Sequence, residues 1–271
     1  MRPLPGGLFG STVPYYARFR PGYDHRLSGL LRERFGLDGT QRVLDLGAGS
    51  GALTLPLARM VREVVAVDPE PAMLAEGRRL AARAGLTGID WRLGDSGALL
   101  ALDVGPVLLA AMGASFHWME RERPLRDLDT LVTAGGAVVL ASCGARHDDL
   151  EPPPWQRVVD EVRERHLGPD RRPGAGLAAY PEVRHQDVLA RSPFSRLEEA
   201  HWDGTVSRTV DQVIGLQLSF SFSSPAALGP DRPAFERDLR AALTGFQPDG
   251  RSGAASFDER VRTEVVIATR P

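Results

Sequence analysis

The chain has 271 residues, of which 33 are basic and 35 acidic, and a formal net charge of −2. This balance gives no electrostatic reason to expect a nucleic-acid partner, and no apolar run approaches the roughly 20 residues that a membrane span needs. The sequence contains no lysine, which excludes a P-loop lysine, a Schiff-base lysine and a Tyr-x-x-x-Lys dyad.

The predicted elements begin with an aromatic and basic cluster at residues 15–23, and a helix follows at about 27–35. Apolar runs then alternate with segments of helical period, which is typical of a parallel sheet with helices on both faces. Ligands of such sheets bind beyond the carboxyl ends of the strands. Strands are predicted at 42–47, 63–68, 88–93, 105–112 and 135–143, and helices at 52–61, 70–84 and 119–133.

The alternation stops after residue 145. We predict helices near 155–162, 180–191, 209–219 and 232–245, a strand at 195–206 and a closing edge strand at 261–269. We interpret the chain as a single domain in four parts. These are an N-terminal helical segment (1–40), a cofactor-binding core (41–145), a helical cap and substrate region with one core strand (146–250), and a closing strand (251–271).

A glycine-rich loop follows the first predicted strand, at Gly47, Gly49 and Gly51. Glycines let the backbone pass close to a ligand, and the helix that follows offers unpaired N–H groups to an anion. Asp68 ends the second strand, where a carboxylate can accept hydrogen bonds from both ribose hydroxyls. This pattern predicts a nucleoside-binding βαβ unit, although the loop alone also fits a dinucleotide.

Features around the loop favour a ligand with a single nucleoside over a dinucleotide. Asp45 precedes the first glycine by two residues, and its carboxylate would repel a pyrophosphate but suits an ammonium group. Asp95 follows the third strand, where it can accept from the exocyclic amine of adenine. Phe116-His117-Trp118 follows the fourth strand.

In these features the sequence resembles the class I S-adenosylmethionine-dependent methyltransferases. It is most similar to the branch with Phe-His-Trp after the fourth strand and an aromatic-Arg-Pro-Gly-Tyr segment before the first. Residues 42–143 carry the matches, and residues 146–250 match only in outline. The resemblance implies a Rossmann-like α/β fold with a mostly parallel seven-stranded sheet, an antiparallel last strand and a helical cap. It also implies S-adenosyl-L-methionine as cofactor, S-adenosyl-L-homocysteine as product and no metal.

The resemblance further implies a set of cofactor contacts. The loop residues should line the amino-acid end of the cofactor, Asp68 should hold the ribose, and the remaining positions should surround the adenine and the methionyl part. The complete set is Tyr16, Arg20, Gly47, Ala48, Gly49, Asp68, Pro69, Met73, Asp95, Ser96, Met112 and Gly113.

His117 is the candidate catalytic residue. A neutral imidazole near the transferred methyl could remove a proton from a hydroxyl acceptor, which is worth on the order of 10²–10⁴ in rate. The alternative is that Phe-His-Trp only shapes the pocket and supports the cofactor. Phe116, Trp118 and Trp155 are the candidate substrate-binding residues.

We therefore expect methyl transfer to an oxygen or nitrogen of a small molecule in secondary-metabolite or antibiotic biosynthesis, by in-line displacement in a desolvated pocket. A small-molecule acceptor is the expected partner, with neither nucleic acid nor membrane, and the oligomeric state stays open. The first residues lack the apolar core of a signal peptide, so we expect a cytoplasmic protein. Two alternatives stay open, an NAD(P)-dependent oxidoreductase and a non-catalytic cofactor-binding protein.

Overall fold

The computed structural model describes residues 10–144, 152–170, 183–246 and 256–271. Its centre is a seven-stranded sheet in the order β3-β2-β1-β4-β5-β7-β6. The first five strands pair in parallel, whereas β7 runs antiparallel to both of its neighbours, β5 and β6. The strands are β1 (Arg42–Leu46), β2 (Glu63–Asp68), β3 (Ile89–Leu93), β4 (Val107–Gly113), β5 (Val132–Gly144), β6 (Arg196–Arg208) and β7 (Phe257–Thr269).

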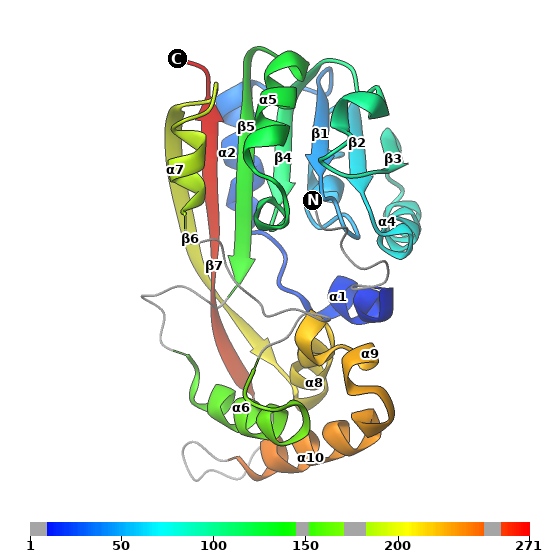
Figure 1. Ribbon diagram of the computed structural model, residues 1–271. Helices are drawn as coiled ribbons and strands as arrows, with labels where there is room; N and C mark the ends of the chain where they lie inside the picture. Colours follow the sequence, from blue (N-terminus) through cyan, green and yellow to red (C-terminus); the bar gives the residue numbers. More distant parts are fainter. Residues whose placement is uncertain (1–9, 145–151, 171–182, 247–255) are drawn as a thin grey trace.

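The predicted fold class is confirmed, but the last strand is not at the edge. β7 lies between β5 and β6, and β6 forms the edge of the sheet (Figure 1). The burial of the two strands gives the reason. Residues 265–268 of β7 form a continuous buried apolar run, as expected for a strand covered on both faces. β6 instead alternates between partly buried and exposed positions along most of its length, which suits an edge.

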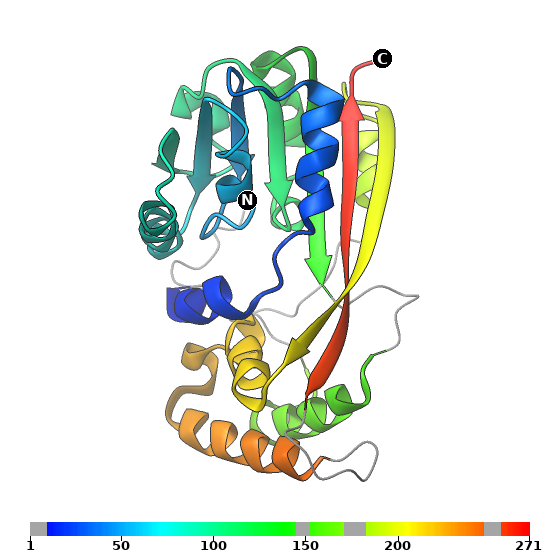
Figure 2. The same cartoon turned by 180° about the vertical axis from the view of Figure 1, so that it is seen from behind.

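Helices cover both faces of the sheet. α2 (His25–Phe35) and α3 (Thr54–Leu57) pack on one face, which Figure 2 shows towards the viewer, through apolar side chains that include Leu31 and Leu57. The other face packs against α5 (Glu122–Leu131) and α7 (His185–Leu189). α4 (Pro71–Arg83) lies beside β2 and β3.

One predicted helix is much shorter than expected. The sequence pattern predicted a helix at 52–61, but α3 has only 4 residues. Residues 58–60 continue as turns, because the N–H groups of Arg59 and Met60 donate to the carbonyls of Pro56 and Leu57, three residues back and not four.

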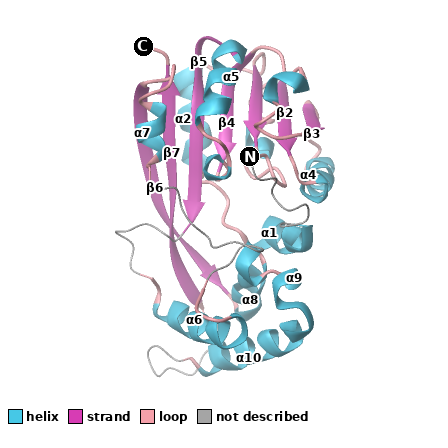
Figure 3. Cartoon of the chain, viewed as in Figure 1, coloured by secondary structure: helices cyan, strands magenta, loops and turns pink. Residues whose placement is uncertain are grey.

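A second group of helices forms a cap beyond the carboxyl ends of β1, β2 and β4 (Figure 3). β6 and β7 are each 13 residues long, and both run on from the sheet into the cap. The cap has its own apolar core around Trp155, Phe235 and Phe257. Its helices are α6 (Pro154–Leu167), α8 (Val210–Leu218), α9 (Pro225–Leu228) and α10 (Arg232–Gly245).

The first helix lies between the sheet and the cap. α1 (Val13–Phe19) packs against α8, where the Phe19 ring is so close to Gly215 that a Cβ there would lie 2.3 Å from it. Among the described helices, none combines the length and the apolar character needed to cross a membrane. Short 3-10 helices complete the fold as η1 (Gly10–Thr12), η2 (Leu99–Leu102), η3 (Phe116–Trp118), η4 (Ser221–Ser223) and η5 (Gly229–Asp231).

Candidate active site

The glycine loop after β1 is tied directly to the end of β2. The backbone N–H groups of Gly47 and Ala48 both donate to the carbonyl of Val67, at 2.8 and 2.9 Å. Gly47 has a φ of 77°, and a Cβ there would lie 2.4 Å from the Cβ of Ser115. Glycine is therefore required at this position by both the backbone conformation and the space available.

Asp68 is the last residue of β2 and is almost fully buried. Its Oδ2 accepts a hydrogen bond from the N–H of Gly49 at 2.7 Å, and its Oδ1 accepts from the N–H of Glu70 at 2.9 Å. Burial raises the pKa of Asp68. Each carboxylate oxygen has two lone pairs, so the carboxylate can still accept from the two hydroxyls of a ribose.

Asp45 brings a second carboxylate to the same loop. It is 1% exposed, and its Oδ2 accepts from the hydroxyl of Thr54 at 2.5 Å. Within the described part of the chain, Oδ1 is buried and meets no hydrogen-bond donor. Burial raises the pKa of Asp45 to about 7. A cationic group beside Oδ1 would remove this cost, so the site fits the ammonium end of an amino-acid moiety.

Of the residues predicted to surround the adenine, Pro69, Asp95 and Ser96 follow β2 and β3, and Met73 lies on α4. The N–H of Gly94 donates to the carbonyl of Asp68 at 3.2 Å, which places the turn after β3 beside the ribose position. Asp95 accepts through Oδ1 from the N–H of Gly97 at 2.6 Å. The structure buries Met73 and Ser96 and leaves Pro69 exposed.

Tyr23, which lies before α2 and was not among the predicted site residues, contacts the end of β4. A Cβ on Gly113 would lie 2.6 Å from the hydroxyl of Tyr23, while the neighbouring Met112 is buried. Burial raises the pKa of Tyr23 well above its usual range, and Tyr16 and Asp45 add to this effect. The only sequence signal for Tyr23 was its place at the end of the aromatic cluster before the first strand.

Tyr16 and Arg20 connect α1 to the segment that follows α8. The Arg20 guanidinium lies 4.0 Å from the centre of the Phe220 ring and 5.1 Å from that of Tyr16. It also donates through Nη2 to the carbonyl of Ser219 at 3.4 Å. Phe220 stacks on Phe222 at a centroid distance of 5.0 Å. These side chains form an aromatic and cationic layer between α1 and the cap.

His117 belongs to η3, in the loop after β4. Its ring lies 4.9 Å from that of Trp118. Burial lowers the pKa of His117 to about 4, and His185 lowers it further. The imidazole is therefore neutral at physiological pH and carries one lone pair and one N–H.

The candidate substrate-binding aromatics occupy three different environments. Trp118 is 39% exposed, whereas Phe116 is fully buried in the core beneath α5 and α7. Trp155 lies in the cap core, where it packs edge-on against Phe257 and donates through Nε1 to the carbonyl of Asp258 at 3.0 Å. The apolar helix pattern around Trp155 thus marks the interior of the cap, and the structure does not bring Trp155 to the sheet edge.

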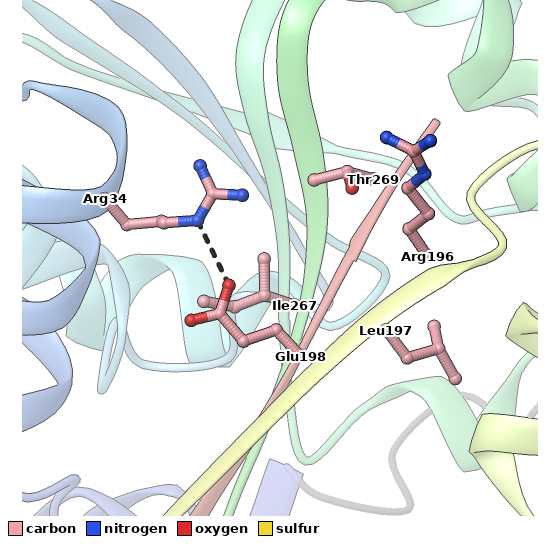
Figure 4. Close-up of a pocket in the computed structure, with 6 residues that line it drawn as sticks. All are labelled: Arg34, Arg196, Leu197, Glu198, Ile267 and Thr269. Atoms are coloured by element: carbon pink, nitrogen blue, oxygen red, sulfur yellow. Dashed lines mark hydrogen bonds and ion pairs between the residues drawn. The ribbon is translucent and has the colours of Figure 1, made fainter. Parts of the chain in front are cut away.

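A hollow of about 240 Å³ lies elsewhere on the molecule. Figure 4 shows its lining, which includes the ion pair between Arg34 and Glu198 at 3.1 Å. Thr269, which also lines it, pairs with Ala137 early in β5, whereas the carboxyl end of β5 pairs further back along β7. The hollow is therefore at the amino ends of the parallel strands, away from the glycine loop.

The fold is a Rossmann-like α/β fold, and the buried carboxylates of Asp45 and Asp68 lie at its glycine loop. A family model described as a methyltransferase domain matches residues 43–136. An uncharacterized methyltransferase of Mycobacterium tuberculosis is 30% identical over 220 residues, which are 80% of this chain and 79% of that protein. An uncharacterized methyltransferase of Schizosaccharomyces pombe is 30% identical over 164 residues, and here the chain covers only 61% of the relative's length.

Solved structures show the same fold. A type II methyltransferase from Anaeromyxobacter dehalogenans superposes with a TM-score of 0.58 at 23% identity, covering 93% of this chain and 98% of that one. A [4+2]-cyclase superposes with a TM-score of 0.53 at 16% identity, covering 98% of this chain and 94% of that one. Taken with the sequence relatives, the chain belongs to the class I S-adenosylmethionine-dependent methyltransferase family. It is a methyltransferase.

Proposed function

We propose that the protein transfers the methyl group of S-adenosylmethionine to an oxygen or nitrogen of a small molecule, in secondary metabolism. The observation that carries this proposal is the pair of buried carboxylates at the glycine loop. Asp68 has the lone pairs to accept from a ribose, and Oδ1 of Asp45 lacks a donor among the described residues. An adenosyl group with an ammonium-bearing side chain matches both requirements.

The remaining contacts follow from the positions around these two carboxylates. Gly47, Ala48 and Gly49 would line the amino-acid end, and Asp95 and Ser96 would meet the edge of the adenine. When bound, the cofactor supplies a methyl group already activated by the positive charge on sulfur. The protein then has to align the acceptor with that methyl group and exclude water, and alignment alone can be worth roughly 7–11 kcal/mol.

The cap supports a small-molecule acceptor. Tyr16, Arg20 and Phe220 form a layer of rings and guanidinium between α1 and the helices of the cap. Such a layer would enclose a small acceptor more readily than a polymer. A ubiquinone biosynthesis O-methyltransferase of Methylocella silvestris is 35% identical over 120 residues, which are 43% of this chain and 46% of that protein, and this similarity supports oxygen as the acceptor atom.

His117 is our candidate for proton removal from a hydroxyl acceptor. The oxygen gains the methyl group and must lose its proton, and a neutral imidazole can take it. With a pKa of about 4, His117 is a weak base. Proton transfer would therefore accompany methyl transfer, when the acceptor oxygen becomes strongly acidic, and would not precede it. An amine acceptor that arrives neutral would not need this step.

Calorimetric titration tests the cofactor assignment. We expect S-adenosylhomocysteine to bind with a dissociation constant in the micromolar range or below, and we expect NADH to show no binding. Radioactive methyl transfer from the labelled cofactor to a panel of small hydroxylated and amino compounds then tests the activity. Binding of NADH without binding of S-adenosylhomocysteine would contradict the proposal.

A further inference from the structure

Arg121 joins the loop after β4 to the start of α7. Its Nη1 donates to the carbonyl of Val183 at 2.7 Å and lies 3.2 Å from Nδ1 of His185. Val183 precedes α7 and His185 is the first residue of that helix. A single guanidinium therefore fixes the segment that enters α7 beside the loop that carries His117.

The chemistry of arginine decides the protonation of His185. A guanidinium has only donors, so Nδ1 of His185 must accept, and the proton of the neutral ring lies on Nε2. Burial lowers the pKa of His185, and the positive charge of Arg121 lowers it further. His185 is thus held as a neutral ring with Nε2–H as its only hydrogen-bond donor.

Among the described residues, Nε2–H of His185 has no hydrogen-bond partner. The hydrogen bond that the ring makes there is the one between its Nδ1 and Arg121. The ring is half-buried and packs edge-on against Phe116 at a centroid distance of 5.1 Å. It is close enough to His117 to lower the pKa of that residue. Val183, two residues before His185, is 42% exposed, and Trp118, next to His117, is 39% exposed.

We propose that His185 is a specificity-determining residue whose Nε2–H donates a hydrogen bond to the methyl acceptor, next to the atom that receives the methyl group. This inference rests on the proposed methyl transfer and deepens it by naming the class of acceptor. The acceptor would be a hydroxyl compound with a second oxygen on the neighbouring carbon. Its apolar body would contact Trp118 and Val183, and Arg121 would act as a positioning residue by holding the tautomer of His185.

Two substitutions of His185 separate its hydrogen bond from its packing. His185→Phe keeps an aromatic ring against Phe116 but removes the donor. His185→Gln places an amide N–H near the position of Nε2 and should restore the interaction. The probes are 2-methoxyphenol and 4-methoxyphenol, which are isomers with one hydroxyl each and differ in whether a second oxygen is adjacent.

The measurement is calorimetric binding of each probe to the full-length protein saturated with S-adenosylhomocysteine. We expect the wild type to bind 2-methoxyphenol at least about fivefold more tightly than 4-methoxyphenol, which corresponds to one modest hydrogen bond. His185→Gln should keep most of this preference, and His185→Phe should lose it while its affinity for 4-methoxyphenol stays the same. Histidine nitrogen NMR should show the proton on Nε2 in the wild type and a mixture of tautomers in Arg121→Met.

The outcomes distinguish this inference from the proposed function. If S-adenosylhomocysteine itself does not bind, the methyltransferase proposal fails and this inference falls with it. If S-adenosylhomocysteine binds but the wild type binds neither probe, or does not discriminate between them, only the role of His185 is overturned. Retention of the full preference by His185→Phe would overturn it as well.

Discussion

Asp45 is the residue at which stability and cofactor binding oppose each other. Its pKa rises from 3.8 to about 7 because its carboxylate is buried. Below pH 3.8 Asp45 is protonated in both the folded and the unfolded state, so its burial does not change the stability. Between pH 3.8 and about 7 the unfolded chain ionises Asp45 and the folded protein does not, so the free energy of unfolding falls as the pH rises. A shift of about three units corresponds to on the order of 4 kcal/mol.

We expect Asp45→Asn to raise the melting temperature of the cofactor-free protein at pH 8 and to leave it nearly unchanged at pH 4. The same variant should bind S-adenosylhomocysteine at least about tenfold more weakly at pH 8, because it lacks the charge that would meet the ammonium group. Thermal melts and calorimetry at the two pH values check both effects. A lower melting temperature than the wild type at pH 8 would show that the carboxylate has a partner after all.

Asp68 should matter for binding in a different way, through hydrogen bonds to the ribose. Asp68→Ala removes the acceptor of the Gly49 N–H as well as the ribose contact, and we expect at least a tenfold loss of affinity for S-adenosylhomocysteine. Asp90→Ala is the control, since Asp90 lies on β3 and pairs with Arg92 at the surface. Calorimetric titration showing equal affinities for the two variants would contradict the assignment.

A catalytic role of His117 can be distinguished from a role in cofactor binding by comparing kcat with the affinity for the cofactor product. His117→Ala should keep the affinity for S-adenosylhomocysteine and lower kcat more than a hundredfold if the acceptor is a hydroxyl. Because burial lowers its pKa to about 4, protonation of His117 should cause no fall in kcat between pH 8 and about pH 5.5. A loss below fivefold would assign His117 a purely structural role.

At the scale of elements, α1 makes a close contact with α8 through Phe19 and Gly215. Gly215 and Gly29 are both glycines inside helices, where alanine normally stabilises by about 0.5–1 kcal/mol. At Gly29 nothing lies within 4 Å of an added Cβ, whereas at Gly215 the Phe19 ring lies 2.3 Å away. The two positions therefore form a matched pair.

We expect Gly29→Ala to raise the free energy of unfolding and Gly215→Ala to lower it by about 1–3 kcal/mol. Gly215→Ala should also weaken binding of S-adenosylhomocysteine, because it displaces the helix that carries Tyr16. Denaturant unfolding and calorimetry measure the two effects. If Gly215→Ala is as stable as Gly29→Ala, α1 adjusts freely and its packing does not set the site.

The elements also show which parts of the molecule the sequence could predict. Strand positions, the glycine loop and Asp68 follow from local patterns, because an apolar run, a left-handed turn and a terminal acid lie within a few residues of each other. The position of β7 inside the sheet depends on pairing with distant β6. Tyr23 contacts Gly113 and His185 contacts Phe116 through packing between segments distant in sequence. The helical apolar pattern around Trp155 could not tell a cap core from a substrate pocket.

At the scale of the whole molecule, a buried ion pair connects the sheet, the cap and α1. Arg208 on β6 pairs with Glu259 on β7 at 2.7 Å, and both side chains are at least nine-tenths buried. The Nη1 of Arg208 also donates to the carbonyl of Phe19 at 3.0 Å. The last residue of α1 is therefore held by the strands that enter the cap.

Arg208→Met should lower the free energy of unfolding by about 3–5 kcal/mol, since it leaves the Glu259 carboxylate buried without a partner. Arg208→Met combined with Glu259→Leu should recover most of that loss, because no charge stays buried. Denaturant unfolding of both variants gives the comparison. A double variant no more stable than the single one would indicate that the pair stabilises the fold by more than mutual neutralisation.

The strands β6 and β7, which the sheet and the cap share, also limit how the cap can be exchanged. The ladder between them is continuous from the pair Arg196 and Thr269 to the pair Arg208 and Phe257. Any exchange of the cap as a cassette between homologues would have to cut this ladder in two places. Evolution and protein engineering alike are then left with single replacements on a fixed frame, or with changes in the connections outside the ladder.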